Sequence, residues 1–260
     1  MSTGDSTSAA GDFVPAPPAS PLLDERLRDS WDANATAWTL AVREQRIPSR
    51  RAGTDAAIVA AIESVCAGRA SLRVLDVGCG EGWLARAIAN PSRDVLGIDG
   101  SAGLIAHACA IPMPGVRYDT VSYEAIIADA AADAAAEGDA QAVAGPWDLI
   151  VCNFALLGDP LSPLLAALAR RLTPDGSLLI QTVHPWNAMG DGPYTCGWRE
   201  EQFQGFGVTF PDAMPWYFRT LASWHQELDD AGLRIRALHE PLHPETRRPL
   251  SLLLRCDRRR

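Results

Sequence analysis

Short apolar runs alternate with segments of helical periodicity over most of the chain. The apolar runs predict strands near residues 72–77, 94–98, 116–118, 147–152, 177–183, 233–239 and 250–255. Strands that alternate with helices indicate a doubly wound, mainly parallel sheet with helices on both faces. The reversal between the last two runs is too short for a crossover helix, so the final strand is expected to be antiparallel.

The N-terminal region is expected to be a helical cap over residues 22–68. Residues 23–51 have an amphipathic helical pattern, with Trp31 and Trp38 seven residues apart on one face. A second helix is expected over residues 55–65, ending at Gly68. A further helix is expected over residues 220–232.

Two insertions interrupt the alternation. Residues 126–145 are dominated by alanine, which favours helix, and are expected to form a surface extension. Residues 184–220 hold nine of the chain's eighteen aromatic residues, with glycines and prolines that disfavour a long helix. Because long loops in compact domains tend to be functional, we expect this aromatic-rich insertion to be a lid.

Composition and net charge limit the classes of partner that the chain is expected to bind. A chain of 260 residues with a net charge of -9 and a pI near 5.0 lacks the basic face that nucleic-acid binding needs, so a small-molecule partner is expected. Residues 1–21 have the composition of a disordered tail, which leaves residues 22–260 as one domain. Six scattered cysteines, no export signal and no apolar span predict a cytoplasmic protein that does not enter a membrane. The sequence leaves the oligomeric state open.

The main chemical signal is the sequence VLDVGCGEGWL at residues 74–84, where a strand runs into a turn with Gly78, Gly80 and Gly82. Glycines at alternate positions let a ligand approach the main chain closely. A dinucleotide fingerprint would need a glycine where Trp83 stands, which weakens a nicotinamide-dependent oxidoreductase. A second acid, Asp99, ends the next strand, so the pattern indicates a nucleoside site at the carboxyl edge of the sheet.

This pattern, with the order of elements over residues 31–256, resembles the class I S-adenosylmethionine-dependent methyltransferases. The resemblance implies seven strands in the order 3-2-1-4-5-7-6, with strand 7 antiparallel, and S-adenosylmethionine as the cofactor. It also implies that Gly78 and Gly80 pass under the cofactor and that Asp99 accepts hydrogen bonds from the ribose hydroxyls. Asp76 would order the loop or meet the cofactor's amino group.

The resemblance places further cofactor contacts at other strand ends: Ser122 and Tyr123 at the adenine, and Asn153 and Phe154 at the methionine and methyl group. Cys79 and Gly100 complete the predicted cofactor set, with Cys79 filling space rather than acting as a nucleophile. Simple alternatives are a turn or capping role for Asp99 and packing against the sheet for Tyr123 and Phe154.

On the acceptor side, His184 is the candidate general base, because it leaves the fifth strand beside the expected cofactor. Its alternative is a structural histidine at a strand end. The candidate acceptor contacts are Trp38, Trp186, Tyr217 and Arg219. Arg43, Arg50 and Arg51 are candidates for contact with the cofactor carboxylate or an acidic substrate, with a solvated face as their alternative.

Two motifs point away from other functions. Asn153-Phe154-Ala155-Leu156 lacks the Pro-Pro-aromatic sequence of enzymes that methylate adenine or glutamine amides. His239-Glu240-Pro241-Leu242-His243 matches H-E-x-x-H, but its prolines oppose the helix that a zinc site requires, so no metal is expected. The sequence therefore predicts a small-molecule methyltransferase acting on oxygen or nitrogen, with a non-catalytic cofactor-binding sensor or assembly protein as the alternative.

Overall fold

The computed structural model describes residues 21–131 and 143–259, and its main feature is a seven-stranded sheet. The order β3-β2-β1-β4-β5-β9-β8 corresponds to 3-2-1-4-5-7-6 for these seven strands, as predicted. The strands of this sheet are β1 (Leu72–Val77), β2 (Arg93–Asp99), β3 (Val116–Thr120), β4 (Trp147–Asn153), β5 (Leu172–Val183), β8 (Leu233–His239) and β9 (Ser251–Arg258). Residues 1–20 of the predicted tail fall outside the described residues, as does the middle of the alanine-rich segment, and Pro21 begins the first helix.

The first five of these strands are parallel, and β9 is antiparallel to both β5 and β8. The turn before β9 closes with a bridge between Leu242 and Pro249, which confirms the predicted reversal. β5 begins at Leu172, five residues before the predicted start, because Leu172 pairs with Trp147 ahead of a shift in register.

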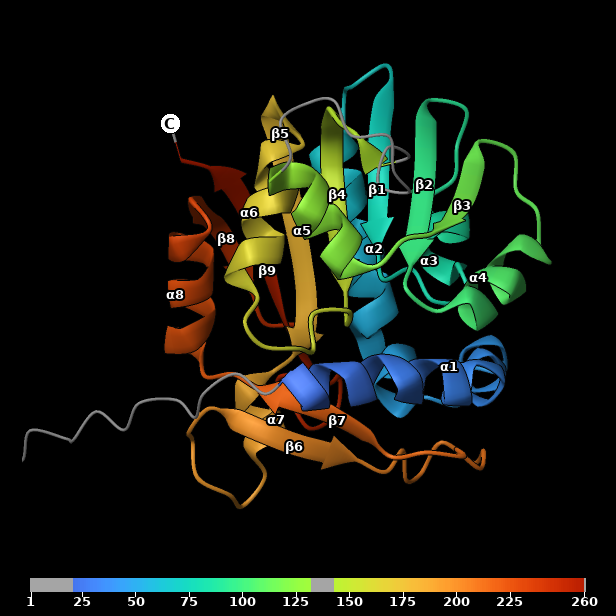
Figure 1. Cartoon of the computed structure of the whole chain (residues 1–260), viewed down its shortest axis with the longest axis vertical. Helices are drawn as coiled ribbons and strands as arrows, with labels where there is room; N and C mark the ends of the chain where they lie inside the picture. Colours follow the sequence, from blue (N-terminus) through green and yellow to red (C-terminus); the bar gives the residue numbers. More distant parts are fainter. Residues whose placement is uncertain (1–20, 132–142, 260) are drawn as a thin grey trace, which may run out of the picture.

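Helices cover both faces of the sheet (Figure 1). One face packs against Ile58 and Ile62 of α2 (Asp55–Cys66) and Leu84 of α3 (Trp83–Ala87). The other packs against α5 (Tyr123–Ala131), α6 (Ser162–Arg170) and α8 (Leu221–Asp230). α4 (Ala102–Cys109) lies beside β3. Both faces of the central strands are therefore buried, which is why their sequences are continuous apolar runs.

Helix α1 (Pro21–Arg43) crosses the carboxyl edge of the sheet (Figure 1). The prediction that this helix continues to about Arg51 is wrong. Gln45 adopts a φ of 53°, and Pro48 disfavours helical backbone at the residue before it. A short π-helical turn, η1 (Arg50–Thr54), leads into α2.

The aromatic-rich insertion forms a short helix and a two-stranded sheet. α7 (Pro185–Met189) is followed by β6 (Gly197–Glu201) and β7 (Met214–Phe218), which pair antiparallel. In Figure 1 these two strands lie on the far side of α1 from the main sheet. None of the described helices combines the length and apolar character that crossing a membrane demands.

Candidate active site

A cavity of about 660 Å³ lies at the carboxyl edge of the sheet, between the strand ends, α1 and the aromatic-rich insertion. Nine of the ten predicted cofactor positions line it, together with Trp38 from α1. These nine are Gly78, Cys79, Gly80, Asp99, Gly100, Ser122, Tyr123, Asn153 and Phe154.

The glycine loop after β1 is shaped by contacts that no side chain would permit. Gly78 has a φ of 69°, and a Cβ there would lie 2.4 Å from the Cβ of Ala155. Gly82 has a φ of 80°, and a Cβ there would lie 2.5 Å from the Tyr118 hydroxyl. Glycine is therefore required at both positions, for conformation as well as for space.

Asp99 connects the glycine loop to the start of α4. Its Oδ2 accepts a hydrogen bond from Gly80 N at 2.9 Å, and its Oδ1 accepts one from Ser101 N at 2.9 Å. Burial raises the pKa of this carboxyl. Each oxygen has a further lone pair, so the turn-ordering role leaves room for two ligand hydroxyls.

Asp76 is the one predicted cofactor residue that does not line the cavity. It is buried, accepts a hydrogen bond from the backbone of Ala85, and has no partner for Oδ2 among the described residues. Burial and the neighbouring Asp99 raise its pKa to about 7. Of the two predicted roles, its position fits ordering of the loop.

The exit of β4 presents an unusual backbone to the cavity. Phe154 has a φ of 54°, a conformation that is rare outside glycine and that recurs at functional sites. Its N–H donates to Gln181 O at 2.7 Å, and Tyr123 Oη donates to Ala155 O at 3.1 Å. Asn153 Oδ1 is buried without a partner in the described part of the chain, which leaves an acceptor for a ligand.

His184, predicted to lie beside the cofactor as a general base, does not line the cavity, although its neighbour Val183 does. The ring is buried, with Nε2 2.7 Å from Glu240 Oε1, while Nδ1 accepts from Trp186 N at the start of α7. Both ring nitrogens are thus committed to local structure. His239 and Glu240 of the H-E-x-x-H string lie at the end of β8 and beyond it rather than on a helix.

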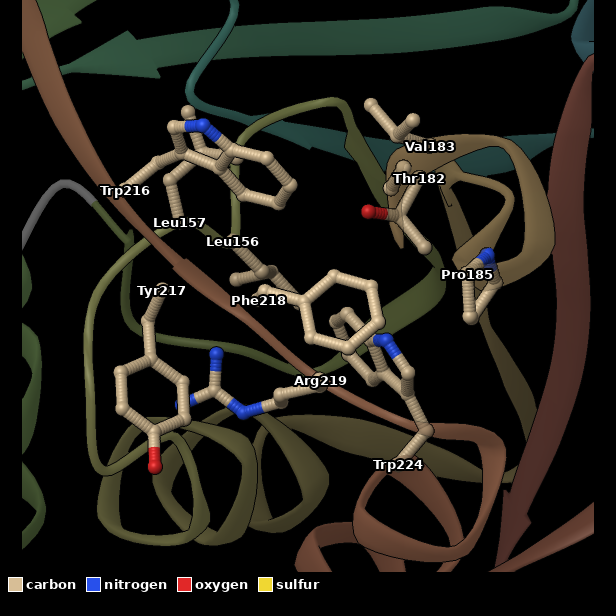
Figure 2. A pocket seen from close by; sticks show the side chains of 11 residues that line it. Leu156, Leu157, Thr182, Val183, Pro185, Trp216, Tyr217, Phe218, Arg219 and Trp224 are labelled. Carbon is tan, nitrogen blue, oxygen red and sulfur yellow. The ribbon is translucent and has the colours of Figure 1, made fainter. Parts of the chain in front are cut away.

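Three predicted acceptor contacts also lie away from the main cavity. Figure 2 shows Tyr217 and Arg219 around a separate pocket of about 10 Å³, which has room for about one water molecule. The Arg219 side chain is 1% exposed and its Nη2 lies 2.7 Å from Asp159 Oδ1. Trp186 is 62% exposed. The sequence places all three near the sheet edge, but it does not show which way they point.

The sequence assigns no individual site role to five further residues that line the cavity, although the last four lie in the insertion predicted to be a lid: Trp31, Phe203, Phe206, Met214 and Trp216. The signal that could have found them is the pairing of Trp31 with Trp38 on one helical face. In the structure the rings of Trp31 and Trp38 lie edge to face with their centres 5.1 Å apart. The centre of the Phe203 ring lies 6.0 Å from that of Trp38. Aromatic rings from two distant segments thus form one wall of the cavity.

The three candidate arginines lie in different surroundings in the structure. Arg43 Nε donates to Glu81 Oε2 at 2.8 Å, and Arg51 is exposed. Arg50 lines the cavity, donates to Asp55 at 2.9 Å, and lies 4.2 Å from the centre of the Trp83 ring. Of the three, only Arg50 is placed to meet a cofactor carboxylate.

A family model described as "Methyltransferase domain" matches residues 33–238. The chain belongs to the methyltransferase family. This membership confirms the resemblance to the S-adenosylmethionine-dependent enzymes that the glycine loop and Asp99 predicted, and with it the predicted cofactor.

Two curated methyltransferases match part of the chain. Trans-aconitate 2-methyltransferase from Deinococcus radiodurans is 35% identical over 112 residues, covering 42% of this chain and 37% of that protein. Ubiquinone biosynthesis O-methyltransferase from Acinetobacter baumannii is 31% identical over 129 residues, covering 47% of this chain and 48% of that protein. The chain thus spans less than half the length of each of these relatives.

Solved structures share the fold. Magnesium protoporphyrin IX methyltransferase from Synechocystis PCC 6803, with bound SAH, superposes with a TM-score of 0.60 at 19% identity, covering 90% of this chain and 99% of that one. An S-adenosylmethionine-dependent methyltransferase from Listeria monocytogenes, described as putative, superposes with a TM-score of 0.57 at 22% identity. The match covers 79% of this chain and 100% of that one. At these identities the likeness establishes the architecture.

Proposed function

We propose that this protein transfers a methyl group from S-adenosylmethionine to an oxygen or nitrogen atom of a small molecule. The observation that carries the proposal is that Asp99 and the glycine loop open onto a cavity that continues past Asn153 and Phe154 to an aromatic wall. The names of the two curated relatives, which describe small-molecule methylation, support the same class of acceptor.

The residues at the strand ends fit this cofactor. Asp99 would accept from both ribose hydroxyls, because each of its oxygens makes only one backbone hydrogen bond. Gly78 and Gly80 leave the main chain accessible, and Asn153 Oδ1 offers an unpartnered acceptor. Arg50 would meet the carboxylate. When bound, the cofactor supplies a sulfonium methyl group for in-line displacement.

The chain's own contribution to the reaction is positioning. Trp31, Trp38 and Phe203 would hold an apolar acceptor beside the end of β4, and holding two reactants in line can supply much of the rate. His184 is held by Glu240 and the start of α7, so it has no assigned role as a general base. An acceptor that is already nucleophilic needs none.

The alternative of a non-catalytic cofactor-binding protein is disfavoured by the size and lining of the cavity. Such a protein needs no enclosed space beside the methyl group. Here the cavity is lined by Met214 and Trp216 of the aromatic-rich insertion in addition to the residues assigned to the cofactor. The aromatic-rich insertion therefore serves better as a wall of the site than as a docking surface.

Calorimetry with S-adenosylhomocysteine tests the proposal. The wild-type protein should bind one equivalent, and Asp99→Ala should weaken binding by about tenfold or more, since two charge-assisted hydrogen bonds are lost. Asp94→Ala, an exposed carboxylate on the same strand, is the matched control and should bind normally. Failure of the wild-type protein to bind, or equal binding by Asp99→Ala, would contradict the proposal.

A further inference from the structure

Helix α1 runs along the cavity, which therefore has one end near the C-terminus of the helix and another near its N-terminus. Asp24, Leu27, Trp31 and Trp38 all line it, at spacings that place them on one helical face. Trp38 lies at the glycine loop, where a Cβ on Gly80 would be 3.8 Å from its Nε1. Asp24 lies about 21 Å further along the helix, at the rise of an ideal α-helix. The glycine loop lies at the first end, Arg28 pairs with Glu124 beside Tyr123 partway along, and the space around Asp24 at the second end is left for the acceptor.

The second end carries excess negative charge. Asp24 Oδ1 accepts from the backbone N–H of Asp159 at 3.3 Å, which places two acidic residues next to each other. The Arg219 guanidinium forms ion pairs with both Asp159, at 2.7 Å, and Glu227, at 3.9 Å. Arg28 is paired with Glu124 at 2.7 Å. Four carboxylates thus share two guanidiniums, and both Asp24 and Asp159 face the cavity.

The buried polar atoms of the described lining that lack a partner are hydrogen-bond acceptors. Two of the described lining residues have buried side-chain atoms without a partner, and both atoms are oxygens: Glu81 Oε1 and Asn153 Oδ1. Of the two arginines among the described lining residues, Arg50 is assigned to the cofactor carboxylate and Arg28 is paired with Glu124 at 2.7 Å. A ligand that suits this wall brings hydrogen-bond donors and positive charge, and a polycarboxylate does not.

The aromatic side chains of the cavity wall also favour a positively charged ligand. Trp31, Trp38 and Trp216 line the cavity, and indole faces attract ammonium groups more strongly than other aromatic side chains do. An apolar body with a cationic group would bury its carbon atoms against these rings while its charge lies at the carboxylates.

We infer that the methyl acceptor is an apolar molecule with an ammonium group that lies against Asp24 and Asp159, and that the oxygen or nitrogen that takes the methyl group is a separate, unprotonated atom of the same molecule beside the end of β4. The inference rests on the proposed function and names the acceptor class for that same site. It assigns Asp24 as a specificity-determining residue. It also disfavours a polycarboxylate as the acceptor, because such a molecule binds best to unpaired cationic side chains.

Matched probes test the inference. With S-adenosylhomocysteine saturating the first end, phenylbutylamine, phenylbutanol and phenylbutanoate are titrated while tryptophan fluorescence is followed. The amine should bind about tenfold more tightly than the alcohol, and the carboxylate most weakly. Asp24→Asn keeps the acceptor for Asp159 N but removes the charge, and should abolish the advantage of the amine while leaving the affinity for S-adenosylhomocysteine unchanged. Asp29→Asn, an exposed carboxylate on the same helix, is the control and should keep the preference.

The results that would contradict this inference differ from those that would contradict the proposed function. If S-adenosylhomocysteine does not bind, the proposed function fails before any probe is added. If it binds, four results would overturn the amine assignment: equal binding of the probes, a preference for the carboxylate, no binding of any probe, or a preference for the amine that survives Asp24→Asn.

Discussion

Arg43, the last residue of α1, donates from Nε to Oε2 of Glu81 in the glycine loop at 2.8 Å. The same oxygen lies 2.7 Å from Arg86 Nη2, and the Glu81 side chain is fully buried. The helix that covers the cavity is therefore tied to the loop that forms its floor. Cofactor binding and closure of α1 should depend on each other through this ion pair.

Arg43→Ala should loosen α1 without unfolding the protein. Glu81 keeps Arg86 as its partner, so the loss of global stability should be only about 1 kcal/mol. Hydrogen exchange over residues 21–43 should accelerate, and the affinity for S-adenosylhomocysteine should fall by about tenfold. Arg51→Ala, an exposed arginine just beyond the helix, should change neither. Unchanged exchange and affinity in Arg43→Ala would show that the ion pair does not hold the helix.

Trp38→Ala should affect both stability and binding, because its ring contacts Trp31, Phe203, Phe206 and Phe210. Removing a half-buried indole from this cluster should lower the free energy of unfolding by about 2 kcal/mol, measured in urea. Trp186→Ala removes an indole that is 62% exposed, and should cost less than about 0.5 kcal/mol. Equal losses in the two variants would contradict the assignment of Trp38 to the cavity wall.

Asp76 should make the stability of the ligand-free protein depend on pH. Burial and Asp99 raise its pKa to about 7, above the unfolded value, so the folded state holds a proton that the unfolded state releases. Its contribution to stability is therefore full below about pH 4 and is lost as the pH rises through about 7. Asp76→Asn should raise the free energy of unfolding relative to wild type at pH 8, by up to about 4 kcal/mol, and by much less at pH 4.

The control for Asp76 is the exposed Asp191→Asn, which should leave the pH profile unchanged. Parallel profiles for wild type and Asp76→Asn between pH 4 and pH 8 would show that Asp76 does not titrate with folding in this range.

His184→Gln separates a structural histidine from a catalytic one. Because the ring contacts Glu240 and the start of α7, its loss should lower the melting temperature. Methyl transfer to any identified acceptor, measured well below the melting temperature, should keep the wild-type pH profile. A pH profile that changes in His184→Gln would restore His184 as a general base.

The sheet was predictable because its strands are buried on both faces and therefore read as apolar runs. β1 was placed at its observed bounds, and Asp99 ends β2 as predicted. The glycine spacing that rejects a dinucleotide site also located the loop, because steric limits at Gly78 and Gly82 leave a direct mark on the sequence.

The acceptor side was less predictable because side-chain direction depends on tertiary packing. Tyr217 follows Trp216 along β7, yet alternate residues of a strand face opposite sides, and only Trp216 reaches the main cavity. The β6–β7 pairing depends on residues far apart in the chain and on their packing against α1. Asp24 was not singled out because a carboxylate in the first turn of a helix has an ordinary explanation at the helix dipole.

The most direct test of the central claim is a crystal structure of the protein with S-adenosylhomocysteine. The account predicts both ribose hydroxyls within hydrogen-bonding distance of Asp99 and the sulfur facing the end of β4 at Asn153 and Phe154. Open space should continue from the sulfur along Trp31 toward Asp24. A ligand bound elsewhere, or a sulfur turned away from that space, would contradict the proposed methyl transfer.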